Sequence, residues 1–287
     1  MLLLQVAING ILLGGIYACI GLGFSLVWGV MNIINVAHGA FLMLGAYVTV
    51  WMFTLHGVDP LVSLPVDMAA LFAFGYLIQW GLINRIVRAP IFMTLVLTFG
   101  LDMLLVNLAL VAWKANYRSV SPWYGPLSLS AGAIIIPVGR LVIFIVSLSI
   151  TASLYGFLTR TRMGRAIQAT RMDLEGAQLV GVRIGQIYAW TFALSAAMAG
   201  AAGSLLAIVT PVSPIMGGAY LGKAFLVCVL GGLGNMAGAL VGGVILGLFE
   251  TGAAVVFGPG YQDAASLVLL LIVLVIRPSG LLGRAYY

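Results

Sequence analysis

Charged residues are scarce in this sequence of 287 residues. Lys, Arg, Asp and Glu together make up 7% of the chain, whereas 63% of its residues are hydrophobic, and the mean hydropathy is +1.17. A typical soluble domain carries about 25% charged residues and is roughly half apolar. The composition therefore excludes a soluble globular enzyme. It also excludes a disordered chain, because disordered chains are polar.

Cysteine and histidine are also rare, which argues against a metal site and against catalysis. The chain has two residues of each kind. Cys19 and Cys228 both lie in apolar segments, where a thiol is expected to pack as a small apolar group. The sequence contains no Cys/His cluster with zinc-ligand spacing, no HExxH and no GxSxG, the patterns of zinc sites, zinc peptidases and serine hydrolases. We predict no catalytic residue and no metal site.

Two Gly-rich stretches imitate nucleotide-binding motifs but lack their essential parts. Residues 217–224 read GGAYLGKA, so Gly217, Gly222 and Lys223 have the spacing of a P-loop, but Ala224 stands where Ser or Thr must hold magnesium. The stretch GGLGNMAG at 231–238 is an equally poor dinucleotide motif. We therefore expect this chain to hold no ATP site and no cofactor of its own.

What the chain has in abundance is long, continuous apolar runs, which predict an all-α, polytopic transmembrane bundle. A membrane barrel needs alternating polarity in short strands, whereas a helix satisfies its own backbone in lipid. The first charged residue is Asp59, so the preceding residues hold two spans of about 20 residues each, with a break expected at 29–39. Further runs cover 62–83, 91–113, 134–158, 186–209, 217–233, 236–257 and 262–276.

These runs predict a single domain over residues 1–287 with about nine crossings, or eight to ten if one of the last three short runs is re-entrant or broken. Cytoplasmic loops are rich in Lys and Arg. The basic residues at 85–88, 160–183 and 277–284 therefore place these segments in the cytoplasm, with 114–133 outside. The N-terminus is then outside and the C-terminus inside. The net charge of +6 reflects this topology rather than binding to nucleic acid.

Two features suggest how the spans pack. The stretch NVAHGAFLMLGAYV at 35–48 is weakly similar to PIMGGAYLGKAFLV at 214–227, and the spans before them run in opposite directions, as in an inverted repeat; chance similarity of apolar sequence is the alternative. Small residues four apart form close helix contacts. We expect these contacts inside the bundle rather than against another subunit, and the glycines concerned are Gly234, Gly238, Gly242, Gly243 and Gly247.

Polar residues inside apolar spans are costly and often functional. We hypothesise that the breaks at 29–39 and 231–238 flank a translocation pathway, because irregular backbone at membrane depth is tolerated only against protein or a water-filled cavity. Such side chains also serve as interhelical hydrogen-bond contacts. The candidate pathway residues are Asn32, Asn35, His38, Asp102, Asn235 and Glu250, with Asn9, Thr94, Thr98 and Asn107 as further polar residues of the spans.

The segment 159–185 is too polar to span a membrane. It contains Asp173, Glu175, Gly176, Ala177 and Gly181 in the pattern E-G-A-x3-G. A short helix with one carboxylate and small residues is suited to docking in a groove of another protein. The alternative is a solvated loop whose arginines only fix topology.

The pattern of this segment resembles the EAA loop of ABC-importer permeases, E-A-A-x3-G, with Gly176 as the departure. Together with GFSLVWGVMNIINVAHGAFLMLGAYV (23–48), TRMGRAIQATRMDLEGAQLVGV (161–182), LGKAFLVCVLGGLGNMAGALVGGVILGLFE (221–250) and IRPSGLLG (276–283), it is similar to the branched-chain amino-acid-type permeases. The similarity covers nearly the whole chain. The compact length is similar to the first of the two permease subunits in that family.

The resemblance implies an importer in an inner membrane. In such a machine a second, usually non-identical permease completes the pathway within the lipid, two cytoplasmic ATPase subunits bind ATP and Mg, and an extracytoplasmic binding protein delivers the solute. The implied solutes are branched-chain or other hydrophobic amino acids, with urea, short amides or small aromatic acids as alternatives. A self-sufficient secondary transporter or channel, with Asp102 and Glu250 as ion-coupling carboxylates, and an intramembrane enzyme are the other classes left open.

Overall fold

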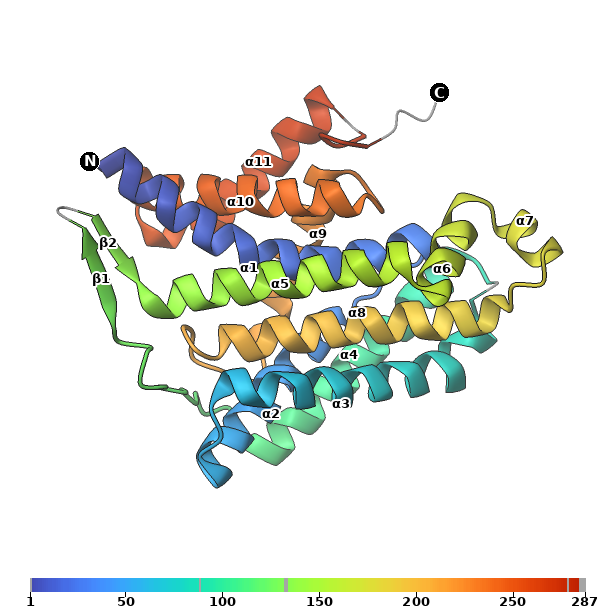
Figure 1. The fold of residues 1–287 in the computed structure, drawn as a ribbon, viewed down its shortest axis with the longest axis horizontal. Coiled ribbons are helices and arrows are strands. Elements are labelled where there is room, and N and C mark those ends of the chain that lie inside the picture. The colour runs from blue at the N-terminus through green and yellow to red at the C-terminus, as the bar shows by residue number, and fades with distance from the viewer. Residues whose placement is uncertain (1, 88, 132–133, 278, 284–287) are drawn as a thin grey trace.

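Helices make up nearly all of the regular structure in this computed structural model, which describes residues 2–87, 89–131, 134–277 and 279–283 (Figure 1). The helices are α1 (Leu2–Met31), α2 (His38–His56), α3 (Pro60–Gly81), η1 (Ile83–Arg85), α4 (Ile91–Trp113), α5 (Val138–Arg160), α6 (Arg162–Met172), α7 (Leu174–Leu179), α8 (Ile184–Leu206), α9 (Met216–Gly231), α10 (Met236–Phe257), η2 (Pro259–Tyr261) and α11 (Gln262–Ile276). Strands β1 (Ser128–Ala131) and β2 (Ile134–Pro137) form an antiparallel hairpin.

All nine apolar runs are helical for most of their length. Eight helices in the described part of the chain are long and apolar enough to cross a membrane, with α11 counted together with η2, and α9 is a shorter apolar helix of 16 residues. Two boundaries differ from expectation. The run expected to span from 134 begins in strand β2, and α5 starts only after Pro137. The break expected at 29–39 is confined to 32–37, because α1 continues as a helix of 30 residues to Met31.

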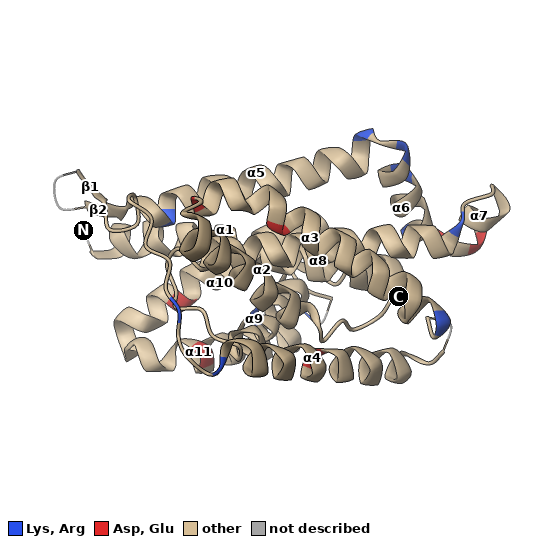
Figure 2. Cartoon of the chain, turned by 90° about the horizontal axis from the view of Figure 1, so that it is seen from below, with Lys and Arg blue, Asp and Glu red and all other residues tan. Residues whose placement is uncertain are grey.

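The bundle is elongated, and its two ends differ. The N-terminus and the β1–β2 hairpin lie at one end, called here the hairpin end, whereas α6 and α7 lie at the other, the α7 end (Figure 1). Basic residues gather around α6 and α7 and are fewer at the hairpin end (Figure 2). Arg88 and Arg284, which contributed to the expected topology, lie outside the described residues.

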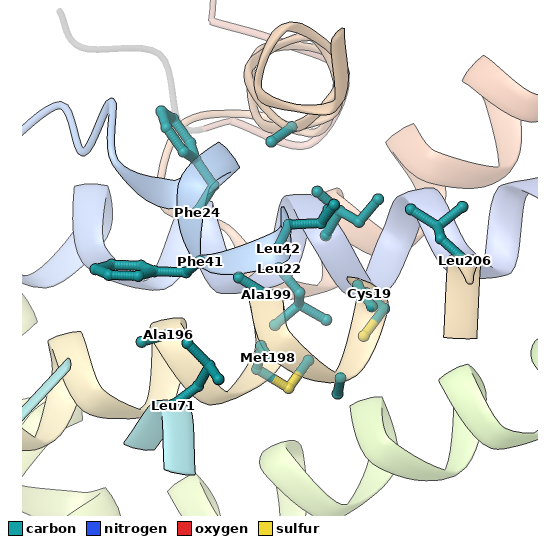
Figure 3. Close-up of a cluster of buried hydrophobic side chains, with 14 of the residues drawn as sticks. Cys19, Leu22, Phe24, Phe41, Leu42, Leu71, Ala196, Met198, Ala199 and Leu206 are labelled. Carbon is teal, nitrogen blue, oxygen red and sulfur yellow. The ribbon is translucent and has the colours of Figure 1, made fainter. Parts of the chain in front are cut away.

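Helices α1 and α8 form the centre of the bundle. In each of them 89% of the most apolar stretch is buried, against 17% in α4 and 6% in α11. Phe24 of α1, Phe41 of α2, Leu71 of α3 and Met198 of α8 meet in the buried cluster shown in Figure 3. Because α4 and α11 expose most of their apolar surface, they are the peripheral helices of the bundle.

The helices form two groups, α1–α4 and α8–α11, and each helix of one group has contacts equivalent to those of its counterpart in the other. Helix α1 packs against α10, and α8 packs against α3 in the same way. Likewise, α2 packs against α8, and α9 packs against α1. The peripheral helices follow, since α4 contacts α2 and α11 contacts α9. Helix α1 runs away from the hairpin end and α8 runs towards it (Figure 1). This is the arrangement of an inverted repeat of four helices. The two similar stretches of sequence fall at the starts of α2 and α9, which are counterparts in the two groups.

Glycines allow α10 to lie close to its neighbours. A Cβ added at Gly243 would lie 2.4 Å from the backbone nitrogen of Ala18 in α1, and one at Gly247 would lie 2.4 Å from the Gly10 carbonyl oxygen. The other three glycines of the expected packing set also lie against the chain itself. Gly238 and Gly242 contact the backbone of α9, and Gly234 contacts Gly29. Close approach of α10 to α1 and α9 therefore requires the absence of a side chain.

Candidate functional site

The break between α1 and α2 is stabilised by a single threonine of α4. Asn32, at φ 53°, lies in the left-handed region and follows the last residue of α1. The Oγ1 of Thr98 donates a hydrogen bond to the carbonyl oxygen of Ile34 at 3.0 Å and accepts one from the N–H of Val36 at 3.2 Å. These bonds satisfy two backbone groups that an interrupted helix leaves open within the bundle.

The first turn of α2 is held by polar groups from three other helices. His38 is completely buried, with its Nε2 3.1 Å from the Ile20 carbonyl oxygen in α1 and its Nδ1 3.4 Å from the Ser195 Oγ in α8. The carboxylate of Asp102 lies against the backbone N–H of Ala40. A carboxylate there complements the positive end of a helix. Thr98 and Asp102 are four residues apart and therefore lie on one face of α4. This face contacts both the break and the start of α2.

Asn35 is the most unusual residue of this break. It is 1% exposed, and neither its Nδ2 nor its Oδ1 has a hydrogen-bond partner among the described residues. Close by, the first turns of α2 and α9 touch through the backbones of Gly39 and Gly217. Transporter solute sites are typically formed where interrupted helices begin inside a bundle. The structure therefore brings Asn32, Asn35, His38 and Asp102 to one such place.

The second break lies between α9 and α10, and the segment around Leu282 packs against it. Gly232 and Gly234 have positive φ values of 97° and 75°. Asn235 caps α10, because its Oδ1 accepts the Gly238 N–H at 3.1 Å, while its Nδ2 donates to the Leu282 carbonyl oxygen at 2.7 Å. Gly234 also lies against Gly29 at the end of α1. The second break thus touches the last turn of α1, next to the first break, but the Asn235 side chain is engaged in capping.

Glu250 lies at the centre of a buried polar cluster and has partners that sequence analysis did not find. The cluster joins four helices. Tyr17 of α1 donates to its Oε2 at 2.5 Å, Ser266 of α11 donates to its Oε1 at 2.7 Å, and Lys223 of α9 forms an ion pair at 3.0 Å. Lys223 also lies 3.2 Å from the exposed Asp263 at the start of α11. Glu250 therefore neutralises a cation inside the bundle.

A second buried carboxylate, Asp67 of α3, was also missed. It is completely buried and accepts a hydrogen bond from the Thr49 hydroxyl of α2 at 2.6 Å. Thr49 lies 2.7 Å from the Ser204 hydroxyl of α8. An acidic residue within the apolar run 62–83 is itself the signal that marks such a site. Lys223 and Asp67 thus belong with the polar residues of the spans.

The segment from α6 to α7 is well ordered by local contacts. Thr161 caps α6 by accepting the Gly164 N–H at 3.0 Å, and Asp173 caps α7 by accepting the Gly176 N–H at 3.0 Å. Ala177 is buried and anchors α7. Gly181, at φ 86°, provides the left-handed turn that follows α7. Asp173, Gly176, Ala177 and Gly181 therefore shape the segment, and Glu175 is exposed on it.

Apolar side chains project from this segment without covering the bundle. Met172 is 85% exposed, Leu179 88% and Val180 78%. They lie beyond the ends of the spanning helices, among arginines, so lipid does not explain their exposure. We call Met172, Leu179 and Val180 the exposed apolar tip.

Residues 6–276 match the model of a protein family described as the permease component of the branched-chain amino acid transport system. The chain belongs to this family. The permease is 33% identical to the high-affinity branched-chain amino acid transport system permease protein BraD of Pseudomonas aeruginosa and 34% identical to LivH of Escherichia coli, in both cases over 98% of this chain and 96% of the relative. It is 27% identical to a probable LivH of Methanocaldococcus jannaschii, over 96% of this chain and 91% of the relative.

No solved structure matches the permease. The family match covers both breaks, the Glu250 cluster and the α6–α7 segment. With its apolar helices, the permease is a multi-pass membrane protein. The relatives are named permease proteins of transport systems, so the geometry described above belongs to a membrane subunit that moves a solute.

Proposed function

We propose that this permease is the membrane subunit of an ATP-driven importer that carries branched-chain or other hydrophobic amino acids across an inner membrane by alternating access. The observation that carries the proposal is the near full-length similarity to high-affinity branched-chain amino acid permeases. The small number of charges in the spans suits a zwitterionic or uncharged solute. Urea, short amides and small aromatic acids are the alternative solutes.

The exposed apolar tip supports docking of partner ATPases on the α6–α7 segment. A P-loop is incomplete in this sequence at Ala224, so ATP and Mg belong to two partner subunits. A second, non-identical permease completes the pathway, and an extracytoplasmic binding protein supplies the solute. The clustering of arginines around α6 and α7 (Figure 2) supports a cytoplasmic α7 end, with the N-terminus outside and the C-terminus inside.

Reconstitution tests the proposal directly. The permease, a second permease and two ATPases encoded beside it are purified together and placed in proteoliposomes with their binding protein. We expect L-leucine to accumulate only when ATP is hydrolysed, and excess isoleucine or valine to compete. Competition by urea or benzoate in place of these amino acids would move the assignment to the alternative solutes. Uptake by the permease alone, driven by an ion gradient, would contradict the ATP-driven machine.

The pathway hypothesis predicts state-dependent reactivity at the breaks. Asn35→Cys is expected to be protected from a small hydrophilic thiol reagent in the resting importer, because Asn35 is 1% exposed, and to react during ATP turnover as the breaks open. Asn32→Cys and Asn235→Cys apply the same labelling to the edges of the first and the second break. The native Cys19 and Cys228 are completely buried, so the unmodified chain gives a low background. Reactivity is read by mass spectrometry.

Ser121→Cys is the matched control for this experiment, since Ser121 is exposed in the segment between α4 and β1 and its reactivity should not depend on ATP. Protection of Asn35→Cys in every transport state would show that the pathway lies elsewhere, because Asn32 is already exposed in the structure.

A further inference from the structure

A completely buried polar cluster joins α2, α3 and α8. Its members are Thr49 of α2, Ser63 and Asp67 of α3 and Ser204 of α8, each with an exposed fraction of 0%. Thr49 Oγ1 lies 2.6 Å from Asp67 Oδ2 and 2.7 Å from Ser204 Oγ. Ser63 Oγ lies 3.4 Å from the same carboxyl oxygen and donates to the Pro60 carbonyl oxygen at 3.0 Å. One acidic side chain is thus joined to hydroxyl groups from three helices.

No basic group neutralises Asp67 in the described part of the chain. Both ion pairs found there are formed by Lys223, and the polar groups that interact with Asp67 are the three hydroxyls. Helix α8 contains no acidic or basic residue. Asp59, which caps α3 two turns earlier, is itself acidic. The titratable or charged side chains of the elements packed against α3 lie elsewhere along those elements, and they are His38, Tyr47 and His56 of α2, Tyr188 of α8 and Arg85 of η1.

The other repeat also buries a carboxylate, and there a lysine neutralises it. Glu250 lies on α10, the counterpart of α3, and it meets Lys223 on α9 and Tyr17 on α1, the counterparts of α2 and α8. Where α9 supplies an ammonium, α2 supplies only the hydroxyl of Thr49. An ionised carboxylate without a paired cation is so costly to bury that such a group is normally neutralised. Asp67 therefore requires either a bound metal cation or a proton.

The distances within the cluster favour a proton. Oxygen ligands lie about 2.0–2.6 Å from a bound Mg²⁺ or Ca²⁺ ion, which keeps neighbouring ligands roughly 3 Å or more apart. The contacts of Thr49 with Asp67 and Ser204, at 2.6 and 2.7 Å, instead have the length of O–H···O hydrogen bonds. Thr49 has one hydrogen for these two contacts, so a neighbour must supply the other.

The second carboxyl oxygen of Asp67 agrees with this assignment. Its Oδ1 is buried and has no hydrogen-bond partner among the described residues. In an ionised carboxylate this oxygen would carry part of the negative charge without any donor beside it. In a carboxylic acid protonated on Oδ2 it is a neutral carbonyl oxygen, which costs less to leave unpaired.

We infer that Asp67 is a proton-binding site, at which the carboxyl group is a neutral acid that donates from Oδ2 to Thr49 Oγ1 while Thr49 donates in turn to Ser204 Oγ. The hydrogen between Asp67 and Thr49 then belongs to Asp67. Two hydrogen bonds link α3 to α2 and α2 to α8 without any charge, and loss of the proton to water would place an unpaired charge between these helices. The site is separate from both breaks and does not depend on which solute the permease carries.

Asp67→Asn tests the charge, because asparagine replaces a neutral acid with a neutral amide of the same shape. We expect the full-length variant in detergent to unfold at the same temperature as the unmodified permease at neutral pH. Glu250→Gln is the matched control, since it makes the same change at a carboxylate that is paired with a cation, and it should lower the unfolding temperature. A fall in Asp67→Asn as large as that in Glu250→Gln would show that Asp67 is ionised and would overturn the inference.

Infrared spectroscopy detects the proton directly. In a maltoside detergent, which has no carbonyl group, the spectrum of the unmodified permease minus that of Asp67→Asn should contain the C=O stretching band of a protonated carboxylic acid. Asp263→Asn removes an exposed acid and should give only carboxylate bands. Thr49→Val, which removes the acceptor of the acid hydrogen, should move the acid band without abolishing it, and it provides the same test if Asp67→Asn does not fold.

Two results would overturn the inference. The first is a difference spectrum for Asp67→Asn, or for Thr49→Val, that shows carboxylate bands and no acid band. The second is an unfolding temperature of the unmodified permease that rises with NaCl but not with choline chloride, and that loses this dependence in Asp67→Asn. That result would assign a metal cation to the site in place of the proton.

Discussion

Glu250→Gln is expected to destabilise the permease by about 1–3 kcal/mol, because it removes the buried counter-charge of the Lys223 ammonium and leaves only the exposed Asp263 beside it. Glu250 is completely buried and 3.0 Å from Lys223, whose side chain is only 14% exposed. The glutamine keeps groups that Tyr17 and Ser266 can bond, so the change isolates the charge rather than the hydrogen bonds. Thermal unfolding of the detergent-purified protein, followed by size-exclusion chromatography, measures the loss.

The double variant Glu250→Gln, Lys223→Met decides whether the ion pair is the cause. Removing both charges of a buried pair is often nearly neutral, so the double variant should recover most of the stability lost in Glu250→Gln. Asp263→Asn measures the second ion pair of Lys223 separately, since Asp263 is 77% exposed and exposed ion pairs contribute about 0–1 kcal/mol. A double variant as unstable as the sum of its single variants would show that the two charges act independently.

The Glu250 cluster also explains how α11 is attached. Only 6% of the apolar stretch of α11 is buried, and lipid supplies no hydrophobic force that would press it against its neighbours. Its two polar contacts, Ser266 with Glu250 and Asp263 with Lys223, lie three residues apart on one face. Helix α4 is attached to the break in the same manner through Thr98 and Asp102. Each repeat thus fixes its peripheral helix by two polar residues.

The sequence was sufficient to predict the helical runs, because a membrane span is a local property of about 20 apolar residues. It also placed a break at 29–39, which includes the observed break at 32–37. The length of α1 and the hairpin could not be read in this way. The length of α1 depends on packing against α8 and α10. The strands at 128–137 are too short for their sequence to be distinguished from the start of an apolar run.

Partners of the intramembrane polar residues could not be predicted at all. Lys223 and Glu250 are 27 residues apart, and Tyr17 is 233 residues from Glu250, so only the fold brings them together. The meeting of Gly39 and Gly217 has the same origin in tertiary contact. The α6–α7 segment was predictable as a segment that does not span the membrane, because of its polar composition, whereas the exposure of its apolar tip required the structure.

Leu179→Asp, Val180→Asp is expected to abolish ATPase binding while leaving the permease folded. These side chains are 88% and 78% exposed, and surface substitutions that remove no contact change the stability by about 0.5 kcal/mol or less. Apolar residues that anchor an interface typically contribute about 2 kcal/mol or more each, so the paired change should weaken ATPase association at least about 100-fold. Co-purification and ATP-dependent leucine uptake measure the loss.

Tyr117→Asp is the matched control, because Tyr117 is also an exposed apolar residue, at 72%, but lies at the hairpin end, away from the α6–α7 segment. It should leave ATPase association unchanged.

Gly181→Trp tests the same surface independently. A φ of 86° at Gly181 disfavours any side chain, so the turn that presents the exposed apolar tip should shift, and ATP hydrolysis should no longer drive leucine uptake. ATPases bound at full stoichiometry in both tip variants would contradict the proposal that they dock on the α6–α7 segment.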